Sequence, residues 1–118
     1  MTYMEAIYLD YNATSPIAPE VYHAMIPYLT TDYGNPSNSY TLGYHAKKAI
    51  TNAREKVAAL IGSQSDEILF TGCGSESNNM VIKGVAYTYK NKGTHIISTK
   101  IEHPSVLEPL RYLEKKWL

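Results

Sequence analysis

Small and polar residues crowd one stretch of the chain, residues 70–79, which reads FTGCGSESNN. It follows an apolar, β-prone run and leads into a helical pattern, so the sequence predicts a strand, a tight turn and a helix. Gly72 and Gly74 permit backbone angles and close approaches that a Cβ atom would block. Ser75 is expected to cap the helix, and the free N–H groups of a helix start suit a phosphate.

A simpler interpretation of this stretch involves no ligand. Ser75 is a common type of helix cap, and Glu76 would complement the positive end of the helix dipole. Taken alone, the stretch favours this interpretation, so the choice depends on the rest of the chain.

His103 is the second candidate for chemistry, because it lies between an apolar run at residues 94–99 and a helical pattern that begins at Pro104. Open α/β sheets present ligand-binding groups at such positions, just past the end of a strand. An imidazole ring is flat enough to stack on an aromatic ring and suits proton transfer near neutral pH. Without further information, a lone histidine at this position is more often a helix cap.

Four ordered segments, spread over almost the whole chain, resemble cysteine desulfurases of the NifS/IscS type, pyridoxal-phosphate (PLP) enzymes of aminotransferase class V. They are YLDYNATSP at 8–16, YGNPSN at 33–38, FTGCGSESNN at 70–79 and HIISTKIEHPSVLEPLRYLEK at 95–115. The resemblance implies conversion of L-cysteine to L-alanine, with the sulfur passed to an enzyme persulfide for iron-sulfur cluster or thiocofactor assembly. It also implies a homodimer and, as partner, an iron-sulfur scaffold or sulfur-acceptor protein.

The resemblance also implies roles for single residues. Gly74 and Ser75 match the positions that contact the PLP phosphate through a main-chain N–H and a hydroxyl, and serine keeps the hydroxyl where many relatives have threonine. His103 matches the histidine that stacks on the PLP ring and assists proton transfer, which makes it the catalytic candidate. The substrate-side candidates, for which an ordinary Asx-type turn is the alternative, are Asn12, Ala13 and Thr14.

Cys73 is the only cysteine of the chain. In the resembling family the catalytic cysteine lies on a mobile loop much further along the chain, so we expect Cys73 to be a buried, inert thiol of the tight turn. The lysine that forms the Schiff base and the acid facing the pyridine nitrogen also lie beyond the last residue of this sequence. The chain is therefore expected to be the N-terminal part of a desulfurase, inactive alone, from a truncated product, a broken gene or an incompletely assembled sequence.

Apolar periodicity and turn residues predict four helices and three short strands. The helices are expected at 19–30, 46–61, 75–89 and 104–117, and the strands at 7–9, 67–71 and 94–99. Such alternation indicates an α/β architecture with parallel strands.

The resemblance makes this architecture the N-terminal part of a PLP-dependent transferase fold, like the large domain of aspartate aminotransferase, with an incomplete sheet and flanking helices. Residues 1–15 would belong to the small domain and the active-site edge, and residues 16–118 to the first part of the large, PLP-binding domain. Later strands of that fold lie between the two at 67–71 and 94–99, so these two are expected to be separated, with Ser75 and His103 facing the gap.

Charge and composition exclude several other functions. Lys and Arg total 11, as do Asp and Glu, so no net field favours a nucleic acid or an anionic membrane. No window approaches the ~18 apolar residues of a membrane span, and no Cys/His cluster has metal-ligand spacing. The sequence predicts a cytoplasmic protein. The alternatives to a desulfurase are another class V activity, such as selenocysteine lyase, and a non-catalytic phosphate-binding or dimer-partner module.

Overall fold

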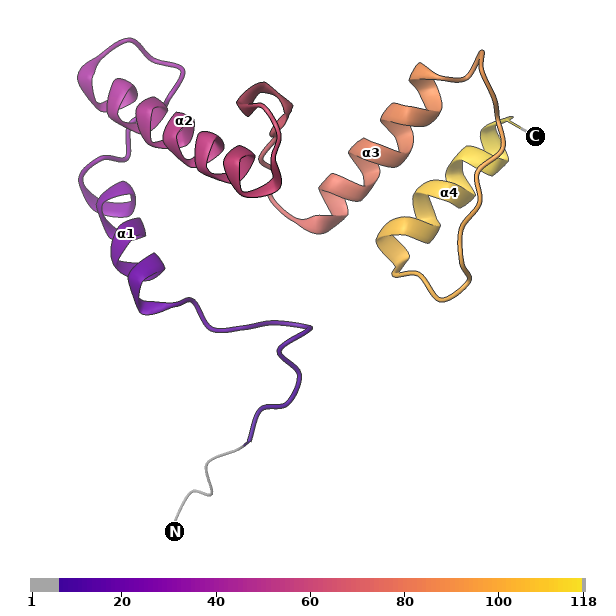
Figure 1. Cartoon of the computed structure of the whole chain (residues 1–118), viewed down its shortest axis with the longest axis horizontal. Coiled ribbons are helices and arrows are strands. Elements are labelled where there is room, and N and C mark those ends of the chain that lie inside the picture. Colours follow the sequence, from indigo (N-terminus) through magenta and orange to yellow (C-terminus); the bar gives the residue numbers. More distant parts are fainter. Residues whose placement is uncertain (1–6, 118) are drawn as a thin grey trace. The chain divides into compact units, whose positions relative to one another are not determined.

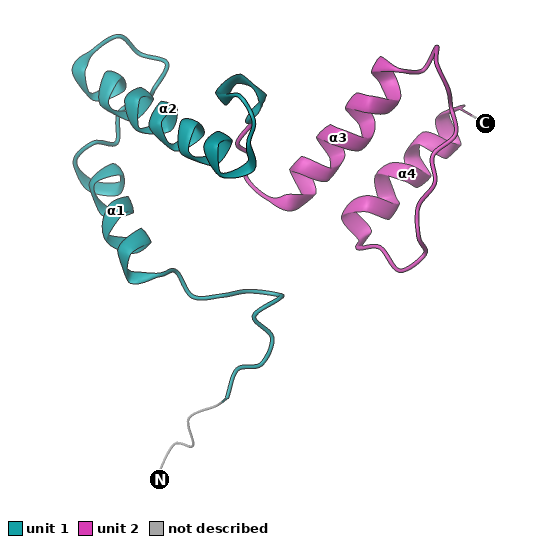
Figure 2. Ribbon diagram, viewed as in Figure 1, with its two compact units in different colours: residues 1–68 teal, residues 69–118 magenta. Residues whose placement is uncertain are grey.

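The computed structural model describes residues 7–117, so residues 1–6, which form part of the predicted 1–15 segment, and residue 118 lie outside the described residues. The described chain forms four α-helices and one short 3-10 helix (Figure 1). In order they are α1 (Pro19–Thr30), α2 (Thr41–Ile61), η1 (Ser65–Glu67), α3 (Gly74–Thr88) and α4 (Pro104–Trp117). The chain divides into two compact units, residues 1–68 and residues 69–118 (Figure 2).

Helix α1 of the first unit confirms the predicted bounds. Pro19 occupies the first turn, where its missing N–H costs nothing. Pro27 lies inside the helix, yet the helix continues to Thr30, and the N–H of Thr31 donates to the carbonyl oxygen of Pro27 at 2.9 Å. The proline therefore does not shorten the helix.

Helix α2 begins at Thr41, five residues before the predicted start at 46. The preceding loop packs directly on the first turn of the helix, where glycines leave room for its backbone. A Cβ atom on Gly43 would lie 2.5 Å from the carbonyl oxygen of Asn38, and one on Gly34 would lie 2.4 Å from the carbonyl carbon of Leu42. Loop packing therefore stabilises the first turn, which the apolar stripe could not reveal.

The C-terminus of α2 agrees with the prediction. Gly62 ends the helix in a left-handed conformation (φ 70°), and its N–H donates to the carbonyl oxygens of Ala58 and Ala59. A residue with a Cβ atom would be strained at this φ.

The second unit is a pair of helices, because α3 and α4 pack side by side (Figure 1). Ala86 of α3 and Leu113 of α4 are buried, with 7% and 2% of their surface exposed. The rings of Tyr87 and Trp117 meet edge to face, with centroids 5.8 Å apart. The bounds of α4 confirm the prediction, and those of α3 are one residue earlier at each end.

Tyrosines and a lysine join the two helices at the surface. The hydroxyl of Tyr87 donates to that of Tyr112 at 3.5 Å, and the Lys116 ammonium donates to both hydroxyls. The hydrogen bond from Tyr87 and then that from Lys116 lower the pKa of Tyr112, while the bond to Tyr87 and then that to Tyr112 raise the pKa of Lys116.

The predicted strands at 7–9, 67–71 and 94–99 are wrong for the described residues, among which no strand occurs. Glu67 is instead the last residue of η1. A strand requires a neighbour to pair with its N–H and C=O groups, and within residues 7–117 no segment pairs with any of these three. The segments at 67–71 and 94–99 do not pair with each other either, which is consistent with the expected separation.

Candidate functional site

Helix α3 begins one residue before its predicted start, so Ser75 is not the cap. Cys73 occupies the N-cap position in an extended conformation (φ −167°, ψ 169°), and its side chain makes no capping hydrogen bond. Ser75 is the second residue of the helix and is exposed. Ser75 is therefore not at the N-cap position, and no residue between 7 and 117 hydrogen-bonds to its hydroxyl.

The turn before α3 is secured by other side chains. The N–H of Gly72 donates to Oε2 of Glu76 at 2.6 Å, and the hydroxyls of Thr71 and Ser77 lie 2.6 Å apart. A Cβ atom on Gly72 would lie 3.3 Å from the Glu76 carboxylate, whereas one on Gly74 would meet nothing within 4 Å. The expected close approach therefore occurs at Gly72 only. Neither glycine has a positive φ, so the expected need for special backbone angles is wrong.

The first turn of α3 presents free donors. Among the described residues, no acceptor engages the N–H groups of Gly74, Ser75 and Glu76, which are left open as in any helix start. These groups carry the partial positive charge at the N-terminal end of the helix dipole. The Ser75 hydroxyl belongs to the same turn, so the arrangement suits an anion such as a phosphate.

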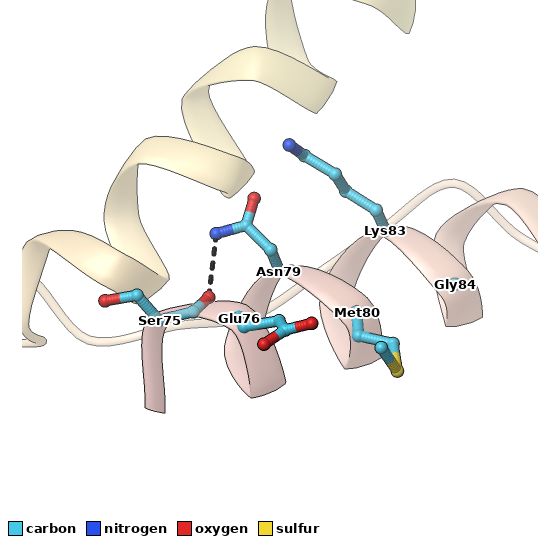
Figure 3. Close-up of a pocket in the computed structure, with 6 residues that line it drawn as sticks. All are labelled: Ser75, Glu76, Asn79, Met80, Lys83 and Gly84. Carbon is cyan, nitrogen blue, oxygen red and sulfur yellow. Dashed lines mark hydrogen bonds between the residues drawn. The ribbon is translucent and has the colours of Figure 1, made fainter. Parts of the chain in front are cut away.

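An open depression of about 550 Å³ lies along α3 from this turn (Figure 3). Asn79 donates its side-chain amide to the carbonyl oxygen of Ser75 at 3.0 Å, which leaves the Ser75 hydroxyl on the other side of the residue (Figure 3). The remaining lining residues are Glu76, Met80, Lys83 and Gly84.

His103 caps α4. Its Nδ1 accepts the N–H of Ser105 at 3.1 Å and lies 2.9 Å from the Ser105 hydroxyl oxygen. The side-chain amide of Asn78, in α3, donates to the same oxygen at 2.9 Å. The structure therefore ties His103 to the helix that carries Ser75, through two residues that the sequence did not single out.

Asn12, Ala13 and Thr14 lie in the first unit, before α1. The N–H groups of Ala13 and Thr14 donate to the carbonyl oxygen of Asp10 at 3.0 and 3.4 Å. The three residues therefore form an ordinary backbone turn, and all are exposed.

Cys73 is exposed, so the expectation of a buried thiol is wrong. No group of three or more His, Cys, Asp and Glu residues within 7–117 could hold a metal ion. Over the same residues, no helix has the length and apolar character needed to cross a bilayer.

Comparison with known proteins identifies the family. The family described as Aminotransferase class-V matches residues 7–117. The chain belongs to this family. Members of the family depend on PLP, and the helix start at Gly74 and Ser75 falls within the matched region.

Two curated relatives of this class V chain are cysteine desulfurases named IscS. The chain is 55% identical to the IscS of Dictyoglomus turgidum over 109 residues and 52% identical to that of Rickettsia typhi over 111 residues. These alignments cover 92% and 93% of the chain but only 28% and 27% of the relatives. The chain thus spans little more than a quarter of their length.

Two solved structures are similar to this chain in both fold and sequence. The class V chain superposes on a NifS-like protein with a TM-score of 0.88 and 40% identity, covering 95% of this chain and 31% of that one. It superposes on SspA in complex with cysteine with a TM-score of 0.86 and 38% identity, covering 94% and 32%. Both similarities extend over nearly the whole chain, although the described residues form no strand.

Proposed function

We propose that this chain is the N-terminal part of a PLP-dependent cysteine desulfurase, in which Gly74 and Ser75 hold the cofactor phosphate and His103 stacks on the cofactor ring. The observation that carries the proposal is the 55% identity to an IscS over 109 of the 118 residues, since it covers the phosphate turn and the histidine segment together. L-cysteine is the substrate and L-alanine the product, and the sulfur leaves as a persulfide of the enzyme.

The first turn of α3 fits the phosphate group. Its three open N–H groups and the unengaged hydroxyl of Ser75 are donors, and a phosphate offers only acceptors and negative charge. Gly74 has no atom within 4 Å of its Cβ direction, so this side of the turn is open to a ligand. The carboxylate of Glu76 accepts the N–H of Gly72 and stays outside the proposed contacts.

The geometry of His103 suits a stacking role. The hydrogen bonds between His103 and Ser105 are made at Nδ1, on the edge of the imidazole ring, so both faces of the ring are available to a second ring. The residue is exposed in the described chain. When bound, PLP supplies an electron sink for an amino acid substrate, while a histidine next to it can hold or move a proton.

The proposal includes the wider expectations from the resemblance. The complete protein is a cytoplasmic homodimer that delivers sulfur to an iron-sulfur scaffold or another acceptor protein. Residues 1–15 belong to the small domain and the active-site edge, where Asn12, Ala13 and Thr14 line the substrate side, and residues 16–118 belong to the large domain. The chain alone is inactive, because the covalent lysine and the catalytic cysteine of the family have no counterpart in it.

A chimera tests this function. The 118-residue chain is joined to the part of the Dictyoglomus turgidum IscS that follows the matched segment. The purified chimera is assayed for bound PLP and, with dithiothreitol added to reduce the persulfide, for alanine and sulfide from L-cysteine. We expect all three from the chimera and none from the chain alone. A chimera that binds PLP but consumes selenocysteine and not cysteine would favour the alternative function of a selenocysteine lyase. A chain that alone binds PLP or inorganic phosphate as a stable domain would favour the non-catalytic module.

A further inference from the structure

A line of hydrogen bonds runs from α3 to the imidazole of His103. It passes from the side-chain amide of Asn78 to the hydroxyl of Ser105 and on to Nδ1 of His103, with both steps at 2.9 Å. Asn78 and Ser105 are partly buried, whereas His103 is exposed. The line therefore anchors an exposed ring to the packed interface of two helices.

The direction of these bonds follows from the donors. The N–H of Ser105 also points at Nδ1 of His103, at 3.1 Å, and a backbone N–H can only donate. Nδ1 must therefore be unprotonated, and in the neutral imidazole the proton is on Nε2. With Nδ1 unprotonated, the Ser105 hydroxyl is the donor to Nδ1, while its oxygen accepts the Asn78 amide.

We propose that Ser105 and Asn78 are positioning residues that hold His103 in the Nε2–H tautomer and fix the plane of its ring. In the other tautomer a proton on Nδ1 would face the N–H of Ser105, and the Ser105 hydroxyl would lose Nδ1 as its acceptor. Nε2 makes no hydrogen bond with the described residues and stays available as the donor of the ring. This inference rests on the proposed function, in which His103 stacks on the cofactor.

The line also connects both proposed cofactor contacts to helix α3. Ser75 and Asn78 are three residues apart in α3, so their side chains lie on one face of the helix. Ser75 would bind the phosphate, while Asn78 hydrogen-bonds to Ser105, which in turn positions His103. A displacement of α3 would therefore move the phosphate contact and the His103 ring together.

The test measures the tautomer directly. Chimeras labelled with 15N only in histidine are compared by NMR, with and without PLP, at a pH where the imidazole is neutral, and a His103→Gln variant assigns the signals. In Ser105→Ala we expect the ratio of the Nε2–H to the Nδ1–H tautomer to fall about fivefold, the factor that corresponds to ~1 kcal/mol for one neutral hydrogen bond. Ser105→Thr, which keeps the hydroxyl, should restore the ratio, and Asn78→Ala should lower it less than Ser105→Ala does.

Two controls make the result specific. Ser98→Ala removes a hydroxyl of the second unit whose hydrogen bond goes to the carbonyl oxygen of Thr99. The NMR signals of His95 show whether this unit keeps its fold. An unchanged ratio in Ser105→Ala, or an equal fall in Ser98→Ala, would overturn the positioning role. The spectra without PLP separate this role from the proposed function, since a chimera that never retains PLP would refute the function and still report the tautomer.

Discussion

The side chain of Ser75 has a specific proposed role and makes no hydrogen bond within the described chain. Its hydroxyl neither caps α3 nor bonds to any described residue. In the chimera, Ser75→Ala should weaken PLP binding about fivefold, because one hydrogen bond of ~1 kcal/mol to the phosphate is lost. A fluorescence titration of the apo chimera with PLP gives this ratio. Thermal unfolding of the apo form should not change, and an unaltered PLP affinity would remove Ser75 from the site.

His103 should affect turnover more than binding. In the chimera, His103→Ala removes ring stacking and a proton-transfer group, and general acid-base catalysis contributes about 10²-fold or more. We expect kcat to fall by about that factor while PLP affinity changes several-fold less. Steady-state rates across the pH range and a PLP titration check this. Because His103 also caps α4, Asn is the matched variant: it keeps a side-chain cap and should be as slow as Ala.

Cys73 offers a test of which cysteine acts. It is exposed and occupies the N-cap of α3 without a capping hydrogen bond, so Cys73→Ser should preserve the turn. We expect the chimera with this change to keep wild-type desulfurase activity within about twofold. Loss of the enzyme persulfide with normal PLP binding would show that Cys73 is the nucleophile.

At the scale of the elements, local signals predicted the helices well and the strands not at all. The bounds of α1 and α4 were predicted because each begins with a proline and carries its own apolar stripe. The first turn of α2 depends on a loop that packs on glycines, and strands depend on partner segments, so neither can be read from one stretch of sequence.

In the candidate site, too, the residues of local motifs were predicted from the sequence and those that depend on long-range contacts were not. Gly74, Ser75 and His103 belong to motifs that the sequence displays directly. Asn78 and Ser105 were missed because their contact joins positions 27 residues apart. Ser105 alone carried a signal, since it lies in the first turn of a helix beside a candidate cap. Asn78 carried none.

Two glycines in helices should respond to alanine in opposite directions. A Cβ atom on Gly84 meets nothing within 4 Å, so in the isolated chain Gly84→Ala should raise helix content, by ~1 kcal/mol of helix propensity. A Cβ atom on Gly43 would lie 2.5 Å from the Asn38 carbonyl oxygen, and the loop must move. Gly43→Ala should therefore lower helix content despite the same gain in propensity. Circular dichroism measures both, and a gain in both variants would contradict the packing of the loop on α2.

At the scale of the whole molecule, little of the described chain is buried. The buried residues within 7–117 are Gly43, Ala46, Ala58, Ala86, Pro109 and Leu113. Large apolar side chains are exposed in each unit, among them Leu60 at 85% and Ile97 at 87%. Burial of such side chains is the main favourable term in folding, at about 1.5–3 kcal/mol for each large residue, so each unit lacks most of the core that a stable domain needs.

The isolated chain should therefore not behave as an independent domain. We expect a broad, weakly cooperative thermal transition, strong binding of a hydrophobic dye such as ANS, and association as the concentration rises, because exposed apolar surface and unpaired backbone invite contacts between copies. In the chimera we expect the rest of the fold to supply neighbours for the segments at 67–71 and 94–99, so the transition should sharpen and dye binding should fall. Calorimetry and light scattering on both proteins distinguish these outcomes. A sharp, concentration-independent transition in the chain alone would contradict this expectation and would support a self-contained phosphate-binding module over a part of a desulfurase.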